Sequence, residues 1–208
     1  MKIAHGIAVI IILLTSSVLT AGAAAVSDSE IPDWVKIRKL FEAYVQYPNK
    51  TNAQKLIQIL PEKHVSYTNN SEEQKALSFI NDREQLGMLE RQVISKDPPA
   101  VRLAFRLRSI ADGGFAEDLD IMLGQLIRID PVLFLTELEN ASPPVTRLDG
   151  LLLNFGAVYV DREEADCLEI DRRITTLKSV DQPQLLIIRN EAVKVLEAKR
   201  KRSCKGRN

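Results

Sequence analysis

Apolar side chains recur every three to four positions along most of this chain. In residues 33–46 four of them share one stripe: Trp34, Ile37, Phe41 and Tyr44. This period is that of an amphipathic helix that buries one face. Similar stripes predict helices over residues 51–60, 71–95, 98–111, 116–129, 131–140, 143–155, 161–178 and 182–200. No segment shows sustained alternation of apolar and polar residues, so we predict an all-α fold without a sheet.

Prolines and polar caps mark where these helices begin and end. Three pairs place an N-cap oxygen before a proline at the first helical position: Asp97-Pro98, Asp130-Pro131 and Ser142-Pro143. A proline there costs no hydrogen bond and has a suitable φ. Thr51 with Gln54, and Ser71 with Gln74, have the spacing of capping boxes. We expect Gly113-Gly114 and Gly156 to end helices, and the polar Asn81-Asp82-Arg83 to interrupt the 71–95 region.

Short turns between helices of ten to twenty residues predict stacked antiparallel helical hairpins. The two Asp-Pro starts lie 33 residues apart, near the period of helical repeat proteins. Residues 97–156 thus resemble two units of a HEAT-like α-solenoid. The resemblance implies the architecture of that segment alone. The length of the chain beyond the N-terminal segment suits one domain, so we expect residues 31–203 to form a single helical domain.

The N-terminus has the parts of a secretory signal peptide. Lys2 precedes an apolar run from Ile7 to Leu14, and the small residues Ala21-Gly22-Ala23-Ala24-Ala25 follow. These parts predict a signal peptide over residues 1–25, cleaved near Ala25, and export to the periplasm or the medium. Because no formal charge lies between Lys2 and Asp28, an uncleaved membrane anchor is the alternative.

Charge and cysteine content narrow the function further. The 28 basic and 28 acidic residues balance, which argues against a nucleic-acid partner, since those proteins carry a strong basic excess. Two cysteines, Cys167 and Cys204, predict a disulfide in an oxidising compartment. The alternative is a buried free thiol at Cys167 and an unpaired thiol in the tail.

Three charged groups are candidates for a site. Arg102 and Arg106 lie one turn apart and would suit an anion or a partner, or would pair with the acids Glu117, Asp118 and Asp120. The acids of residues 161–171 would form a cation site or an acid–base pair, or lie on a solvated face beside Arg162, Arg172 and Arg173. The basic tail, residues 199–208, would contact acidic lipids, polymers or a partner through Lys199, Arg200, Lys201 and Arg202, or would be a soluble helix end tethered by Cys204.

No catalytic constellation, metal-ligand set or cofactor-binding loop stands out in the sequence. His64 is the one histidine beyond the signal segment, and no Gly-x-Ser-x-Gly motif surrounds a serine. We therefore expect a non-enzymatic exported protein that binds another protein, as a scaffold, an adaptor or an inhibitor of the immunity type. One alternative is a carboxylate-dependent enzyme acting on a glycan or cell-wall polymer. Another is attachment to a membrane surface through the N-terminus or the basic tail.

Overall fold

The computed structural model describes residues 32–62, 71–156, 159 and 162–204, and in these residues the regular elements are helices, with no strand. The α-helices are α1 (Trp34–Gln46), α2 (Lys50–Ile59), α3 (Ser71–Ile80), α4 (Arg83–Ile94), α5 (Pro98–Arg108), α6 (Gly113–Ile129), α7 (Pro131–Glu139), α8 (Leu148–Leu153), α9 (Glu163–Lys178) and α10 (Leu186–Ser203). A short 3-10 helix, η2 (Pro183–Leu185), precedes α10. The predicted all-α fold is confirmed.

Some predictions fall outside the described residues. They are the signal segment with its cleavage near Ala25, the lone His64, and the end of the basic tail beyond Cys204. In the described part of the chain, none of the helices combines the length and the apolar character needed to cross a bilayer.

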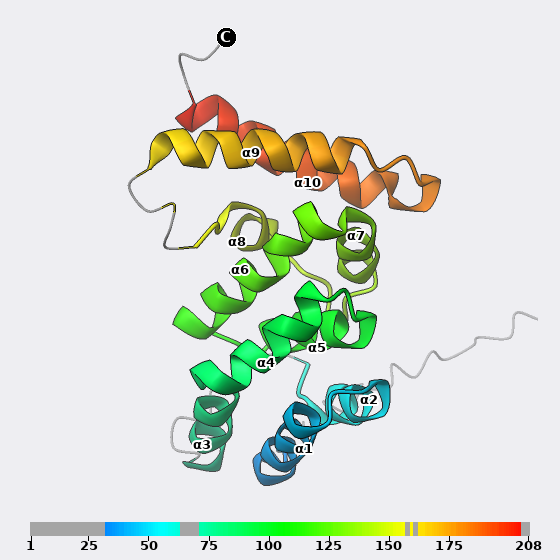
Figure 1. Ribbon diagram of the computed structural model, residues 1–208, viewed down its shortest axis with the longest axis vertical. Coiled ribbons are helices and arrows are strands. Elements are labelled where there is room, and N and C mark those ends of the chain that lie inside the picture. Colours follow the sequence, from blue (N-terminus) through cyan, green and yellow to red (C-terminus); the bar gives the residue numbers. More distant parts are fainter. Residues whose placement is uncertain (1–31, 63–70, 157–158, 160–161, 205–208) are drawn as a thin grey trace, which may run out of the picture. The chain divides into compact units, whose positions relative to one another are not determined.

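The helices stack as hairpins in two layers (Figure 1). α4 packs against α5, α6 against α7, and α9 against α10. In one layer α6 contacts α4, α8 and α9, whereas α2, α5, α7 and α10 follow one another in the second layer. At the N-terminal end of the stack, α1 contacts α2, α3 and α4. Residues from Pro32 onward thus form one compact unit.

One apolar core runs through both layers, from Trp34 in α1 to Leu196 in α10. α5 lies at its centre, and the side chains of Leu103, Ala104 and Leu107 are completely buried. Burial of one large apolar side chain contributes about 1.5–3 kcal/mol. The core therefore holds the two layers together and leaves their outer faces available for other roles.

Two of the three predicted proline starts are confirmed. The Asp97 carboxylate accepts a hydrogen bond from the Ala100 N–H at 3.2 Å, and the Asp130 carboxylate accepts one from the Leu133 N–H at 3.0 Å. Each satisfies a backbone donor in the first turn of a helix, where no intrahelical acceptor exists. α5 and α7 begin at the prolines that follow.

The third proline start was wrong. The Ser142–Pro143 peptide bond is cis, and α8 begins only at Leu148. The Ser142 carbonyl oxygen does not head a helix, because it accepts a hydrogen bond from Nη1 of Arg106 at 3.2 Å. The predicted helix 143–155 is therefore a loop followed by the short helix α8.

Two other helix ends differ from the sequence prediction. Asn49, not Thr51, caps α2, because its side chain accepts from the Asn52 N–H at 2.9 Å. Gly113-Gly114 opens α6 and does not end α5, whose end is already formed by Ser109. The Ser109 hydroxyl donates to the Arg106 carbonyl oxygen at 2.7 Å. The expected interruption at Asn81-Asp82 does occur, with Asp82 capping α4.

The predicted disulfide is present. Cys167 of α9 is bonded to Cys204 at the end of α10, with the two Cα atoms 5.8 Å apart. It joins residues 37 positions apart and fixes the last turn of α10 against the first half of α9. The described residues contain no free cysteine.

Candidate functional site

Arg102 and Arg106 both make contacts within the fold. Arg102 donates to the two carboxylate oxygens of Glu137 in α7, at 2.9 and 2.7 Å. Arg106 donates to the carbonyl oxygens of Leu60 and Ser142, and burial lowers the pKa of its guanidinium. These arginines join α5 to its neighbours in the second layer.

The predicted acidic partners of these two arginines were wrong. Arg108, two residues further along α5, pairs with the buried Asp120 of α6 at 2.9 Å. The reason is the direction of the side chains: Arg102 reaches Glu137 of α7, and Arg106 reaches carbonyl oxygens after α2 and α7. Glu117 and Asp118 make no ion pair with any residue that the structure describes.

The acidic run at residues 161–171 separates into buried and surface groups. Glu169 is buried and accepts a hydrogen bond from Nε of Arg173 at 3.1 Å, and Arg128 of α6 approaches its other oxygen at 3.5 Å. Asp171 pairs with Arg200 at 2.6 Å. Of the three arginines expected beside these acids, Arg173 makes such a pair. The sequence pattern did not reveal that Glu169 lies in the interior.

The described part of the basic tail continues α10 to Ser203. Arg200 is engaged by Asp171, and Nε of Arg202 donates to the Ala198 carbonyl oxygen at 3.3 Å. Lys201 and Arg202 are exposed, and Lys199 is half-buried. The disulfide tethers this end to α9, so the cations lie on an ordered helix.

A hollow of about 420 Å³ lies where α6 meets the junction of α8 and α9. Its walls carry three carboxylates and no lysine or arginine: Glu117, Asp118 and Asp166. Ile121, Leu153, Phe155 and Tyr159 supply apolar and aromatic surface. We call it the acidic hollow.

Local hydrogen bonds fix the far wall of the acidic hollow. The Asn154 side chain donates to the Glu117 carbonyl oxygen and accepts from the Gly156 N–H, both at 3.3 Å. Gly156 has a φ of +87°, a conformation that other residues rarely adopt. The Phe155 and Tyr159 rings then meet edge to face, with their centroids 5.6 Å apart. The chain thus turns sharply after α8 and presents both rings beside α6.

Arg173 supports this wall from the interior. Its guanidinium lies 4.6 Å from the centre of the Phe155 ring and donates to the carbonyl oxygens of Leu151 and Leu152 at 3.2 and 3.0 Å. Burial is the main influence on Arg173 and lowers its pKa, whereas the hydrogen bond that Arg173 donates to Glu169 opposes that shift. Arg173 therefore joins α6, α8 and α9 behind the hollow.

One carboxylate in the acidic hollow has an incomplete set of contacts. Oδ1 of Asp166 is shielded from solvent and has no hydrogen-bond partner among the residues that the structure describes. A shielded oxygen of this kind is costly unless something binds it. The described residues contain no group of acids, histidines and cysteines arranged to hold a metal ion.

A second hollow, of about 510 Å³, adjoins the first between α4 and α6. It shares Asp118 and Ile121 with the acidic hollow. Leu86 and Met122 contribute apolar surface, and Arg83 and Glu90 contribute one charge of each sign. We call the two hollows together the α6 groove, whose lining residues come from α4, α6, the end of α8 with the turn after it, and α9.

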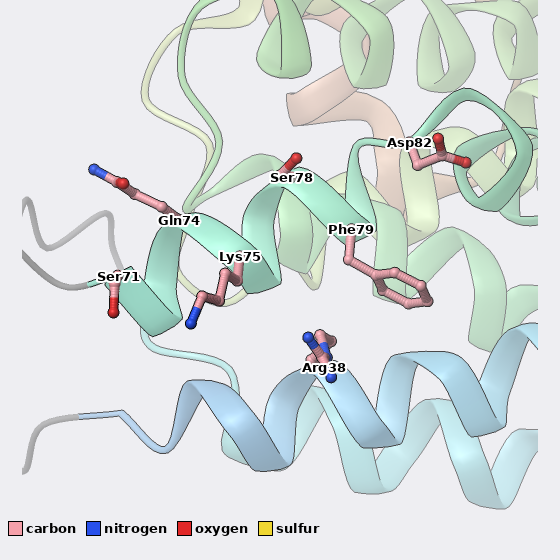
Figure 2. Close-up of a pocket in the computed structure, with 7 residues that line it drawn as sticks. All are labelled: Arg38, Ser71, Gln74, Lys75, Ser78, Phe79 and Asp82. Carbon is pink, nitrogen blue, oxygen red and sulfur yellow. The ribbon is translucent and has the colours of Figure 1, made fainter.

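The largest of these hollows, about 740 Å³, lies between α1 and α3 (Figure 2). Arg38 and Lys75 point into it from opposite helices, beside Phe79. Lys75 pairs with Glu72 at 2.7 Å, and Asp82 is occupied as the cap of α4. With Phe79 as its one large apolar lining residue and most charges engaged, this hollow is a weaker candidate than the α6 groove.

Sequence reasoning identified Glu117 and Asp118 only as ion-pair partners, and it missed the roles of Asn154 and Tyr159. The available signal was local: Asn154 and Gly156 flank a turn, and Glu117 and Asp118 follow the first turn of α6. That this turn lies beside those acids depends on how α8 packs on α6.

No protein-family model matches the chain. No curated protein and no solved structure matches it either.

Proposed function

We propose that this chain is an exported, non-enzymatic helical protein that binds another protein through the α6 groove. The observation that carries the proposal is the pair of adjoining hollows that share Asp118 and Ile121. Their mixed apolar and charged surface is of the kind found in protein interfaces, where apolar centres are bordered by polar groups.

The contacts that the other charged groups make support the same proposal. Arg102, Arg106, Arg108 and Arg173 all make contacts within the fold, so they serve its stability. We extend the HEAT-like interpretation of residues 97–156 to the hairpins of α4 to α10. Such stacks present extended faces to partner proteins, and a scaffold, adaptor or inhibitor role fits that use.

Export rests on two features, the signal-like N-terminus and the Cys167–Cys204 disulfide, since disulfides persist in oxidising compartments. Sequencing the N-terminus of protein recovered from the periplasm or the medium tests it. We expect a chain that begins near Val26. A cytosolic protein that retains Met1 and Lys2 would contradict export.

A capture experiment tests the role of the groove. The exported full chain and its Ile121→Lys variant are immobilised and exposed to periplasmic or secreted extract. Ile187→Lys in α10 is the control, because Ile187 is also apolar and is 74% exposed, outside the groove. We expect a partner retained by the unsubstituted chain and by the control but lost by Ile121→Lys. Equal capture by all three, or by none, would contradict the proposal.

A carboxylate-dependent enzyme is the second candidate, because Glu117, Asp118 and Asp166 line one hollow. An acid and a base within one cleft are what glycoside hydrolysis needs. Incubation with cell-wall polymer and other glycans, followed by a reducing-sugar assay, tests this candidate. Turnover that is abolished by Asp166→Asn would favour the enzyme over the binding protein.

A further inference from the structure

We propose that the partner presents a cationic side chain, lysine or arginine, flanked by apolar residues, and that this side chain enters the acidic hollow. The inference rests on the proposed function and specifies the chemistry of the partner. Its basis is charge complementarity, since the hollow has three carboxylates and no basic lining residue.

The carboxylates of the acidic hollow differ from the paired acids of α6 and α9. Asp120, Glu169 and Asp171 each have an arginine within 3.5 Å. Glu117, Asp118 and Asp166 have no such partner among the described residues. Three carboxylates without an arginine partner thus line one hollow, next to the buried pairs of Asp120 and Glu169.

The unpartnered oxygen of Asp166 indicates what the hollow lacks. It has no hydrogen-bond donor among the described residues, and Asp166 lines the hollow, so a donor bound there would lie beside a carboxylate that the described fold has not paired. An ammonium or guanidinium group supplies both the donor and the opposite charge. A metal ion fits less well, because these three carboxylates are not among any described set of acids, histidines and cysteines placed to hold a metal ion together.

The walls suit the rest of such a side chain. Ile121, Leu153 and the Phe155 and Tyr159 rings provide an apolar channel beside the acids. Lysine and arginine bury their aliphatic stems along apolar surface while the charged end stays with polar groups. Apolar residues of the partner that flank the cation would then occupy the second hollow, between α4 and α6, where Leu86 and Met122 lie.

Neutralising the hollow tests the inference. The full chain carrying Glu117→Gln, Asp118→Asn and Asp166→Asn is compared with the unsubstituted chain and with Glu191→Gln, a control acid that is exposed on α10. Capture from periplasmic or secreted extract is titrated at low and at high salt. Truncating one member of a buried charge pair weakens binding strongly. We expect the triple variant to lose about tenfold or more in affinity, with less dependence on salt, and the control to bind normally.

A zero-length carbodiimide, which joins a carboxylate to an amine as an amide, identifies the occupant. We expect mass spectrometry to find the partner's cationic segment at the hollow, by amide links to Glu117, Asp118 or Asp166 where the cation is lysine. Links from Lys199 or Lys201 of this chain to these acids in purified protein would overturn the inference, because the occupant would be the chain itself.

The outcomes separate the inference from the proposed function. Capture that depends on Ile121 but is unchanged in the triple variant would keep the groove and overturn the cationic partner. Capture that Ile121→Lys does not affect would count against the groove itself.

Discussion

Nε of Arg173 donates to Oε1 of Glu169 at 3.1 Å, and both side chains are only 3% exposed. The two residues lie one helical turn apart in α9. Arg173 also donates to the carbonyl oxygens of Leu151 and Leu152 in α8. One buried guanidinium thus holds the short α8 and the wall of the acidic hollow in place.

Removing that guanidinium should destabilise the protein. Arg173→Met leaves Glu169 with the distant Arg128 as its one ion pair and leaves two carbonyl oxygens without this donor. Breaking a buried pair from one side costs about 3–5 kcal/mol. We expect a loss of about 3 kcal/mol in the free energy of unfolding, measured by urea denaturation.

A control variant and a double variant complete the Arg173 test. Arg172→Met, an exposed neighbour, should change stability by less than about 0.5 kcal/mol. Arg173→Met combined with Glu169→Leu should recover part of the loss, because no buried charge is left behind. An Arg173→Met protein as stable as Arg172→Met would show that the buried pair does not support the fold.

Gly124 in α6 should not tolerate a side chain. An added Cβ would lie 2.7 Å from the Leu151 carbonyl oxygen and 2.9 Å from Nη1 of Arg173. Crowding of this kind typically costs about 1–3 kcal/mol, so Gly124→Ala should lower the thermal midpoint. At Gly87 in α4 the nearest atom would be 3.8 Å away, so Gly87→Ala should stabilise the helix by about 0.5–1 kcal/mol. Destabilisation by both substitutions to the same extent would contradict this packing.

Tyr44 should make the protein sensitive to alkaline pH. Burial, with a smaller effect from Asp97, raises the pKa of the Tyr44 phenol. The folded state therefore holds this proton more firmly than the unfolded state, where tyrosine titrates near pH 10. The stability that this difference in pKa contributes is complete below that pH. It is lost as the pH rises through the pKa of Tyr44 in the folded state.

Tyr44→Phe tests this dependence. The variant should lose stability less steeply above about pH 10, in urea denaturation repeated across that range. It should also gain about 1 kcal/mol at neutral pH, because the Tyr44 hydroxyl is buried with no hydrogen-bond partner in the described part of the chain. Tyr47→Phe, 71% exposed, is the control. Identical pH profiles for the two variants would contradict the account.

The disulfide should contribute to stability through the length of the loop it closes. For residues 37 positions apart, the chain-entropy relation gives about 3–4 kcal/mol. Reduction should lower the denaturation midpoint of the natural chain by a corresponding amount. The Cys167→Ser, Cys204→Ser double variant should already show the lower midpoint, and a reductant should leave it unchanged. No difference between these proteins would show that the tether is not needed.

Much of the fold could be predicted from the sequence because helix formation here depends on local patterns. The Trp34 to Tyr44 stripe is buried as expected, and Asp97 and Asp130 cap helices through residues three positions away. The Ser142 start failed because a residue far away in sequence, Arg106, binds its carbonyl oxygen. The residues next to Ser142 in the sequence give no sign of this contact with Arg106.

The candidate site could be predicted far less well. Arg102 finds Glu137, 35 residues away, and the acidic hollow forms only because α8 packs on α6 and places Phe155 beside Glu117 and Asp118. Charge patterns along the chain show which groups are present. Which of them meet is decided by the packing of helices that are distant in sequence.

Hydrogen–deuterium exchange of the full chain, alone and loaded with its captured partner, tests the central claim most directly. The account predicts slower exchange on binding in residues 115–122 of α6 and 151–156 around the end of α8, with smaller changes in the first turns of α4. Protection confined to α2, α5 and α7, with α6 unchanged, would contradict the α6 groove as the binding surface.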